Sequence, residues 1–417
     1  MKKIFLFAIV AIFAVASCKK YNTLGYTPGT GVPTITSVHT LTTSNDTGTV
    51  QRVIVTMDSA GQMDTTSYAI MAPPEAFDSV TSAGNLGQYY VIYGTNLGSA
   101  TQVTFNGAVA YLNRAWNTDN SIIVDIPSNA PFYGSAATDT LTVTTTHGSV
   151  SFHFSIIPPA PTVNAVSDYD FWTGSQITLT GVGFINVTSV GLVNSGSKSI
   201  TPVTTATIVS QNDSVLVLQF PQTTLGRANL VFSYTSVGTP ATATASQEFV
   251  NLSNATNIVF DNSFQNGWAD NSWQTPSGIT AGVAHGYGFT SCALGTYPSN
   301  GWKIEGWANW YPSLADSGYT YLTFWIRGGT ASHTFTLVGD KAPDGYGQVQ
   351  YASAPTAQQI YVPAGVWTYF KIPIGSGTGQ LNFWATGAVS QELGFFLQGA
   401  STDPNESIYF DEVAFVK

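Results

Sequence analysis

The sequence predicts an all-β protein made of consecutive β-domains, and three observations lead to this prediction. Short runs of alternating apolar and polar residues recur along the chain, as they do in strands that are buried on one face. The 417 residues include 40 glycines and 20 prolines, which separate these runs at turns. One order of strands also occurs twice within residues 33–251, which indicates a duplicated domain.

The first 17 residues have the features of a secretory signal peptide. Lys2 and Lys3 give a basic start, and residues 4–16 form an uncharged apolar run that is too short for a stable membrane span. Cys18 directly follows Val15-Ala-Ser, a context that resembles the lipobox of bacterial lipoproteins and implies a lipidated Cys18 at the mature N-terminus. The alternative is an ordinary signal peptide followed by an unrelated cysteine.

Composition excludes several kinds of function. Charged residues make up 9% of the chain, the formal net charge is −10, and no basic patch of the nucleic-acid-binding type is present. With Cys18 lipidated, Cys292 is the only other cysteine, so neither an intramolecular disulfide nor a cysteine-rich metal site is expected.

Residues 18–32 are polar and rich in turn formers, and they predict a flexible tether.

Two segments after the tether share one order of strands and turns. In each, an alternating strand ends at a glycine-containing turn, in residues 88–98 and 175–184. A later strand in each ends at a proline, in residues 121–127 and 214–221. Strands at this spacing are typical of β-sandwiches. The pattern resembles the IPT/TIG family of immunoglobulin-like domains over residues 33–157 and 161–251, and this resemblance implies spacer or interaction domains.

The first copy departs from that pattern by an insertion at about residues 41–86. The insertion contains the strand-like run Arg52-Val-Ile-Val-Thr-Met, and either an extra hairpin or a small domain would account for its length. Three prolines within residues 157–162 predict a stiff connection between the two sandwiches.

Residues 256–417 predict a third β-domain. Period-2 alternation over residues 319–327, 367–374, 381–385 and 392–398 places aliphatic residues on one face and aromatic and polar residues on the other. The opening Phe260-Asp261 and closing Tyr409-Phe-Asp-Glu-Val segments resemble those of β-jelly-roll carbohydrate-binding modules. The predicted fold is therefore two Ig-like β-sandwiches in tandem followed by a β-jelly-roll domain.

Tryptophan is concentrated in this last domain, because eight of the ten tryptophans lie between Trp268 and Trp384. A β-domain core needs few of them, and an indole face suits sugar rings, which are part apolar and part hydrated. In residues 301–312 we expect Trp302 to face the core and Trp307, Trp310 and Tyr311 to lie on a loop. The alternative is that these aromatic residues close the end of the barrel. The candidate glycan-binding residues are Trp302, Trp307, Trp310, Tyr311, Trp325, Arg327, Trp384 and Gln398, with Asn382 as a further hydrogen-bonding group.

The sequence also contains weaker candidates for a metal site. Asp261 and Asp411 lie near the two terminal strands, and together they are candidate ligands of a structural calcium ion. The alternative is that both are solvated acids at strand ends. No motif requires a cofactor, and the isolated His285 and His333 are expected to be hydrogen-bonded surface groups.

The order of segments resembles the cell-surface glycan-binding lipoproteins of Bacteroidota polysaccharide-utilisation loci. The resemblance implies non-catalytic polysaccharide binding by the C-terminal domain, an outer-membrane location facing the cell exterior, and association with a glycan importer complex. No acidic run follows Cys18, so the sequence leaves the membrane face open. The uncharged aromatic faces and the net acidity favour a neutral plant-type or β-glucan polysaccharide.

Two other functions stay open at this point. A surface adhesin would bind proteins through its Ig-like domains, although it would not need so many tryptophans in one domain. A jelly-roll glycosidase or lyase would need a pair of catalytic carboxylates, and no motif for such a pair is present. We therefore do not expect an enzyme.

Overall fold

The computed structural model describes residues 27–41, 49–57, 63–71, 79–254, 257–311, 313–350 and 352–417. The chain divides into two compact units, residues 1–159 with 236–239 and residues 160–235 with 240–417. Strands and short 3-10 helices make up the regular structure of the described residues, which confirms the predicted all-β class. None of the helices in this part of the chain is long and apolar enough to cross a membrane. The 3-10 helices are η1 (Arg114–Trp116), η2 (Gly134–Ala136), η3 (Phe184–Asn186), η4 (Leu252–Asn254) and η5 (Thr356–Gln358).

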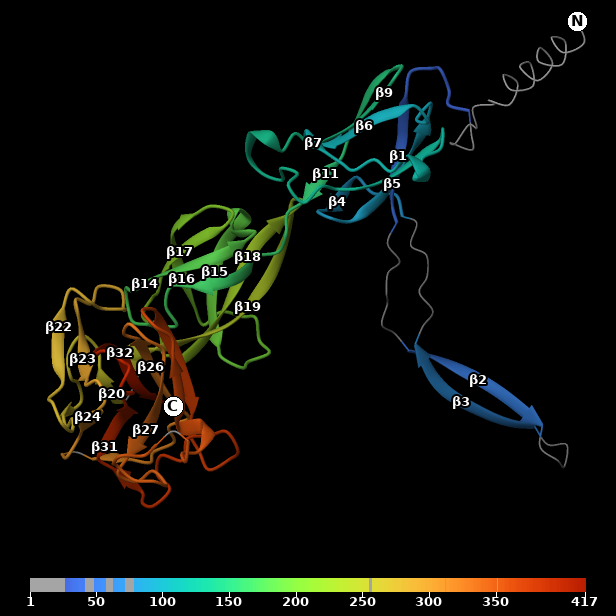
Figure 1. The fold of residues 1–417 in the computed structure, drawn as a ribbon. Helices are drawn as coiled ribbons and strands as arrows, with labels where there is room; N and C mark the ends of the chain where they lie inside the picture. Colours follow the sequence, from blue (N-terminus) through green and yellow to red (C-terminus); the bar gives the residue numbers. More distant parts are fainter. Residues whose placement is uncertain are drawn as a thin grey trace, which may run out of the picture. The chain divides into compact units, whose positions relative to one another are not determined.

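The first unit contains a β-sandwich (Figure 1). Alternate side chains of its strands point into its core. Ile92, Phe105 and Val143 come from three different strands and meet in its core. One sheet has the order β1 (Thr34–Thr40), β5 (Tyr89–Thr95), β8 (Ser121–Asp125). The other has the order β10 (Gly148–His153), β9 (Thr140–Thr145), β6 (Ala100–Phe105), β7 (Ala108–Val109), and β11 (Ser155–Ile157) pairs in parallel with β4 (Ala83–Asn85).

The insertion in the first sandwich contains an antiparallel hairpin. Its strands are β2 (Thr49–Met57) and β3 (Met63–Met71), which pair residue by residue from Thr49 opposite Met71 to Met57 opposite Met63. Figure 1 shows the hairpin as two long strands. Of the two alternatives left open by the sequence, the described residues of the insertion form the hairpin.

The second unit begins with another β-sandwich, built around Ile177, Leu192, Leu218 and Phe232. Gly183, in the turn after the first alternating strand, has a φ of 76°, which explains why glycine stands at this position. The strands follow the order β12 (Thr162–Val166), β14 (Gln176–Val182), β17 (Val215–Gln219), β16 (Thr204–Gln211), β15 (Val187–Asn194), β18 (Arg227–Ser236), β19 (Thr239–Asn251), β13 (Asp170–Phe171).

The C-terminal domain consists of two stacked antiparallel sheets, called sheet A and sheet B below. Sheet A has the order β22 (Gly278–Ala281), β23 (Ser291–Tyr297), β32 (Glu406–Val416), β26 (Tyr321–Arg327), β29 (Trp367–Pro373), and β20 (Asn257–Phe260) also pairs with β32. Sheet B has the order β21 (Ala269–Asp270), β24 (Trp302–Ala308), β31 (Glu392–Gln398), β27 (His333–Gly339), β28 (Gln359–Val362). A short pair, β25 (Leu314–Ala315) and β30 (Val389–Ser390), completes the domain.

The core of this domain lies between the two sheets. Phe324 of β26, Phe395 of β31 and Phe410 of β32 meet there, with ring centroids about 5 Å apart (5.1 and 4.8 Å). The alternation expected for residues 319–327 and 392–398 agrees with this arrangement, because Leu322 and Leu393 also face the core. Each sheet therefore has a second face that points away from the core, and the other side chains of these strands lie on it.

Candidate functional site

The outer face of sheet A packs against the second sandwich. Trp325 is 6% exposed, its ring lies 6.2 Å from that of Tyr169 at an interplanar angle of 27°, and its Nε1 donates to Asp168 Oδ1 at 3.1 Å. The ring of Tyr369 stacks on Tyr169 at 4.8 Å, and its hydroxyl donates to Asp170. The expectation that Trp325 stacks on a sugar does not fit this burial, because His285 stacks on its ring at 3.6 Å and the neighbouring sandwich packs beside it.

Charged and apolar pairs extend this contact along sheet A. Lys371 on β29 pairs with Glu248 on β19, and the Arg227 guanidinium lies 5.1 Å from the Tyr321 ring. At the end of β32, Ala414 and Val416 join Val250 and Leu252 in a small apolar cluster. Sheet A is therefore a domain contact within the second unit.

Several carboxylic acids are buried at this contact. Loss of hydration on burial raises the pKa of Asp168 to about 7 and that of Asp411 to about 6. The same loss raises the pKa of Asp170 and of Glu412 well above the usual range. His285 lies among these acids with its side chain 10% exposed, so the expectation that it is a surface group is wrong. Burial lowers its pKa to about 4.

The outer face of sheet B carries a cluster of four aromatic rings. Trp302 on β24 lies 6.4 Å from Phe396 on the neighbouring strand β31 and 6.3 Å from Trp273. The ring of Trp273 also meets that of Tyr346, at 5.3 Å. Trp273 is 40% exposed, and the Trp302 and Tyr346 rings are half-buried, so part of this aromatic surface faces solvent.

Two glycines make room for Tyr346 on this face. A Cβ atom at Gly306 would overlap the Tyr346 hydroxyl, and one at Gly394 would press on its ring. The two glycines are paired on the adjacent strands β24 and β31. Tyr346 therefore lies flat across the middle of sheet B, held by a 2.8 Å hydrogen bond from its hydroxyl to the Asn271 carbonyl oxygen.

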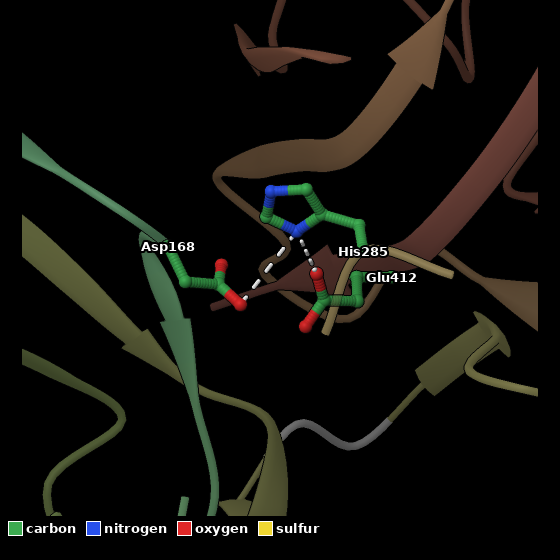
Figure 2. Close-up of side chains that lie close together, drawn as sticks. All are labelled: Asp168, His285 and Glu412. Carbon is green, nitrogen blue, oxygen red and sulfur yellow. Dashed lines mark hydrogen bonds and ion pairs between the residues drawn. The ribbon is translucent and has the colours of Figure 1, made fainter. Parts of the chain in front are cut away.

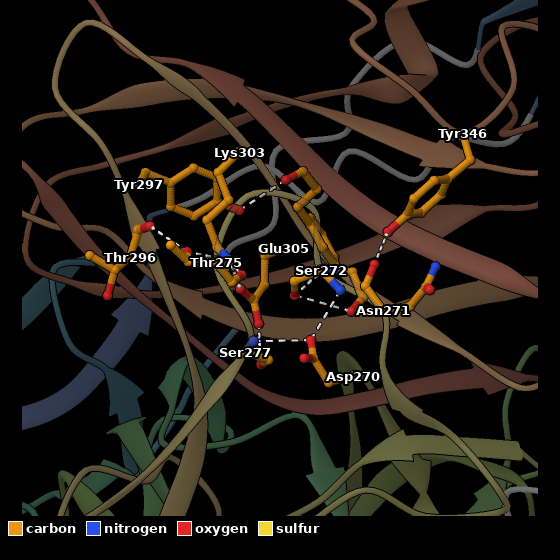
Figure 3. Close-up of polar contacts among 12 residues, drawn as sticks. Asp270, Asn271, Ser272, Thr275, Ser277, Thr296, Tyr297, Lys303, Glu305 and Tyr346 are labelled. Carbon is orange, nitrogen blue, oxygen red and sulfur yellow. Dashed lines mark hydrogen bonds and ion pairs between the residues drawn. The ribbon is translucent and has the colours of Figure 1, made fainter.

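A network of polar contacts fixes the segment that carries Trp273 (Figure 3). The backbone N–H groups of Asn271 and Trp273 donate to the carbonyl oxygens of Gly306 and Ile304, so the segment runs beside β24 like an extra strand. Behind it, Lys303 donates to Thr275, and Ser277 donates to Glu305. Lys303 and Glu305 are fully buried and lie 3.2 Å apart, and burial raises the pKa of Glu305 to about 7.

A groove of about 450 Å³ lies on the same side of sheet B, next to the aromatic cluster. Thr336 forms part of its lining, and its buried hydroxyl has no hydrogen-bond partner among the residues that the structure describes. The Gln398 side chain is exposed at the groove, where its Nε2 donates to the Gly301 carbonyl oxygen at 3.1 Å. The side chains that line the groove are mostly polar and uncharged: Ser332, Thr334, Thr336, Gln350 and Gln398, with Phe396, His333 and Asp403.

The structure separates the residues that the sequence grouped as candidates. Trp302 and Gln398 lie on the outer face of sheet B. Trp307 is 0% exposed and packs between Phe395 and Phe410 in the core, so the expected loop position is wrong. The orientation of β24 is opposite to the expected one, because the charged Lys303 and Glu305 share the inward face with Trp307 and neutralise each other there.

The other candidates lie apart from the groove. Trp310 and Tyr311 are 47% and 92% exposed on the loop after β24, and neither lines the groove. Arg327 belongs to sheet A, where its Nε donates to the Gly365 carbonyl oxygen. Trp384 stacks on Tyr319 at 6.0 Å and donates to the Leu314 carbonyl oxygen. It therefore packs against the core of the C-terminal domain. Asn382 is half-buried on the adjoining turn.

The calcium candidates Asp261 and Asp411 lie near each other at the terminal strands. The Asp411 carboxylate is fully buried and accepts the backbone N–H groups of His285 (2.8 Å) and Glu412 (3.0 Å), one on each oxygen. Calcium takes six to eight oxygen ligands, so the calcium site stays a prediction that would need further oxygen ligands besides these two. The terminal strands β20 and β32 do pair, which is why Asp261 and Asp411 are close enough for their charges to interact.

Sequence reasoning missed Tyr346, Phe396, Thr334 and Thr336 as site residues. A usable signal was present for the two threonines, because they alternate with the core residues Phe335 and Leu337 along β27. His333 was expected at the surface, but its side chain is 9% exposed beside Glu406. The signal peptide, Cys18 and residues 18–26 of the tether lie outside the described residues.

Comparison with known proteins finds one curated relative over part of the chain and several solved structures of low sequence identity. It is 28% identical over 128 residues to an IPT/TIG domain-containing protein of Bacteroides ovatus, a match that spans 30% of this chain and 26% of that relative. The resemblance to IPT/TIG proteins is thus confirmed over that stretch. The chain matches no protein-family model.

Two solved structures similar to the chain are surface glycan-binding proteins. One, from Prevotella bryantii, is 15% identical with a TM-score of 0.49 and aligns over 94% of this chain and 99% of that one. The other, from a complex xyloglucan utilisation locus in Bacteroides uniformis, is 18% identical with a TM-score of 0.39 and aligns over 80% of this chain and 96% of that one.

Proposed function

We propose that this protein binds a neutral polysaccharide without cleaving it, on the outer face of sheet B. The observation that carries the proposal is the position of the aromatic cluster directly beside a groove lined by uncharged hydrogen-bonding side chains. Trp273 and Trp302 offer ring faces for sugar C–H groups, and Thr336 and Gln398 offer polar groups for the hydroxyls.

The groove chemistry supports binding over hydrolysis. Asp403 is the one carboxylate among the described residues that line it, whereas glycosidases use two carboxyl groups on either side of the scissile bond. The same lining supports a neutral ligand, because it has no Lys or Arg to bind a polyanion. Xyloglucan and mixed-linkage β-glucan are the neutral plant-type polysaccharides that we would test first.

The N-terminal part of the chain supports a cell-surface location for this activity. A lipid on Cys18 would anchor the protein in the outer membrane facing the cell exterior, with residues 18–32 as a tether. Ig-like domains at residues 33–157 and 161–251 would then act as spacers for a glycan-binding domain at residues 256–417, close to a glycan importer complex. Cys18→Ala should release the protein from the membrane fraction or block its processing; a wild-type protein that is fully soluble would contradict the anchor.

Affinity electrophoresis of the intact protein tests the binding function. We expect gels containing xyloglucan or mixed-linkage β-glucan to slow its migration, and gels containing a pectic polyanion to leave it unchanged. Chromatography of the same polysaccharides after incubation should show no shortening. Retardation by none of the neutral glycans would count against the proposal, and release of oligosaccharides would show that the protein is an enzyme.

A further inference from the structure

The strongest unassigned feature lies between the second sandwich and sheet A. Asp168 from the segment between β12 and β13, His285 from the segment between β22 and β23, and Glu412 from β32 turn their side chains toward one point (Figure 2). His285 Nδ1 lies 2.9 Å from Glu412 Oε2 and 3.7 Å from Asp168 Oδ2. The three potential ligand atoms all lie within 4.8 Å of one another. We propose that these three residues bind a divalent transition-metal ion, with zinc as the best fit, and that the ion clamps the C-terminal domain to the second sandwich.

The distances between the three potential ligand atoms suit a zinc ion. Zinc binds imidazole nitrogen and carboxylate oxygen at about 2.0–2.2 Å in tetrahedral sites, so neighbouring ligand atoms lie roughly 3.3–3.6 Å apart. The two distances from His285 Nδ1, 2.9 and 3.7 Å, lie on either side of that spacing. Three protein ligands would leave a fourth position for water. The imidazole favours zinc over calcium and magnesium, which take oxygen ligands.

Neighbouring groups hold two of the ligands in the orientation that a metal needs. Asp168 Oδ1 accepts hydrogen bonds from Trp325 Nε1 at 3.1 Å and from the Asp170 backbone N–H at 2.9 Å, which leaves Oδ2 directed toward His285. The His285 ring stacks on Trp325 with centroids 3.6 Å apart, and its backbone N–H donates to Asp411. Such supporting contacts are typical of metal-binding histidines and carboxylates.

A second observation is the set of buried carboxylate oxygens without partners at and beside this cluster. Glu412 is 0% exposed, and among the described residues neither its Oε1 nor the fully buried Asp170 Oδ2 has a hydrogen-bond partner. Among the ion pairs of the described residues, no Lys or Arg contacts Asp168, Asp170, Asp411 or Glu412. Burying unpaired carboxylates is costly, and a divalent ion would offset that cost at the contact between the two domains.

Metal analysis of the intact protein tests this inference. After the protein has been exposed to ZnCl₂ and desalted, we expect inductively coupled plasma mass spectrometry to find one equivalent of bound zinc. Zinc should also raise Tm by about 5 °C or more when present at a hundred times its Kd. It should change the emission of Trp325, which lies against His285. It should also slow proteolytic cleavage between the second sandwich and the C-terminal domain.

Three conservative variants identify the ligands. Asp168→Asn keeps an acceptor for Trp325, and His285→Gln and Glu412→Gln remove one ligand each with little change in volume. Each should weaken zinc binding by roughly a hundredfold or more. His153→Gln changes an exposed histidine on β10 and is the matched control, which should bind zinc like the wild type. Circular dichroism establishes which variants are folded.

Several results would overturn the proposal. A wild-type protein that retains no zinc, or that prefers calcium to zinc, would show that a shared proton or another ion occupies the site. Zinc binding that is equally strong in every folded variant would place the ion elsewhere. The proposal is independent of glycan binding, because Trp302 and Gln398 lie on the other sheet, so each can fail while the other holds.

Discussion

The two outer faces of the C-terminal domain have similar side chains and different surroundings. Sheet A presents Trp325 and Tyr369, and sheet B presents Trp302 and Phe396. On sheet A the aromatic rings pack on Tyr169 of the second sandwich. On sheet B they flank a groove. The comparison shows that aromatic residues on one face form a domain contact, while those on the other face border a groove, which we propose as the binding surface.

The difference arises from partners elsewhere in the chain. Sheet A meets Asp168, Asp170 and Glu248, which accept hydrogen bonds from Trp325, Tyr369 and Lys371. These contacts satisfy the polar atoms of the aromatic side chains while their rings are buried. On sheet B the groove residue Thr336 keeps a buried hydroxyl without a partner among the described residues, as expected of a surface that completes its hydrogen bonds with a ligand.

The largest expected effect comes from a tryptophan on neither outer face. Trp307→Ala would leave a cavity between Phe395 and Phe410, and we expect a loss of about 3–5 kcal/mol in the free energy of unfolding. Chemical denaturation measures it. A variant that is as stable as the wild type would show that Trp307 is not a core residue, and it would reopen its assignment to the glycan surface.

The second effect is the pH dependence of stability that arises from Glu305, which is buried with Lys303 on the inward face of sheet B. The pKa of Glu305 is about 7 in the folded protein against an ordinary value of 4.5, so the folded state holds the proton more tightly. Glu305 therefore makes its full contribution to the free energy of unfolding below pH 4.5, and this contribution is lost as the pH rises to about 7. The loss amounts to at most about 3 kcal/mol.

Thermal unfolding between pH 4 and 8 measures this dependence. Glu305→Gln should reduce its slope, with Asp168 and Asp411 supplying the dependence that remains, whereas Asp316→Asn, which changes an exposed acid, should leave the curve as in the wild type. Equal slopes for Glu305→Gln and the wild type would show that Glu305 titrates normally.

The third effect concerns affinity on the open face. Trp302→Ala removes a half-buried ring from the aromatic cluster, and we expect glycan affinity to fall about thirtyfold, or about 2 kcal/mol, with Tm nearly unchanged. Isothermal titration calorimetry measures it. Trp310→Ala, on the loop beyond the groove, is the matched control and should bind normally. If Trp310→Ala lost affinity while Trp302→Ala bound normally, the glycan would bind at that loop and not on sheet B.

The smallest effect concerns the domain contact. Tyr369→Phe removes the hydroxyl that donates to Asp170 and should lower stability by about 1 kcal/mol, because the buried carboxyl group loses a partner. Glycan affinity should stay at the wild-type value. A clear loss of affinity would mean that sheet A contributes to binding, or that the two faces are coupled through the core.

The sequence by itself determined the local features of this protein. Period-2 alternation assigned Leu322, Phe324 and Ile326 to the core, and turn residues marked the ends of strands. These features follow from backbone geometry within a few residues, so one sequence is sufficient to predict them. The order of segments likewise indicated the β-domains and the concentration of aromatic residues in the last one.

Tertiary structure decided which aromatic residues are available. Alternation along β24 puts Trp302 and Trp307 on opposite faces, and the tertiary structure decided that the face of Trp307, which also carries the buried pair Lys303 and Glu305, points inward. Trp325 is buried by residues far away in the chain, since His285 stacks on its ring and Asp168, more than 150 positions away, accepts its hydrogen bond. The meeting of Asp168, His285 and Glu412 also depends on the docking of two domains. Strand order and domain docking are long-range contacts, and the alternation within one strand carries no information about them.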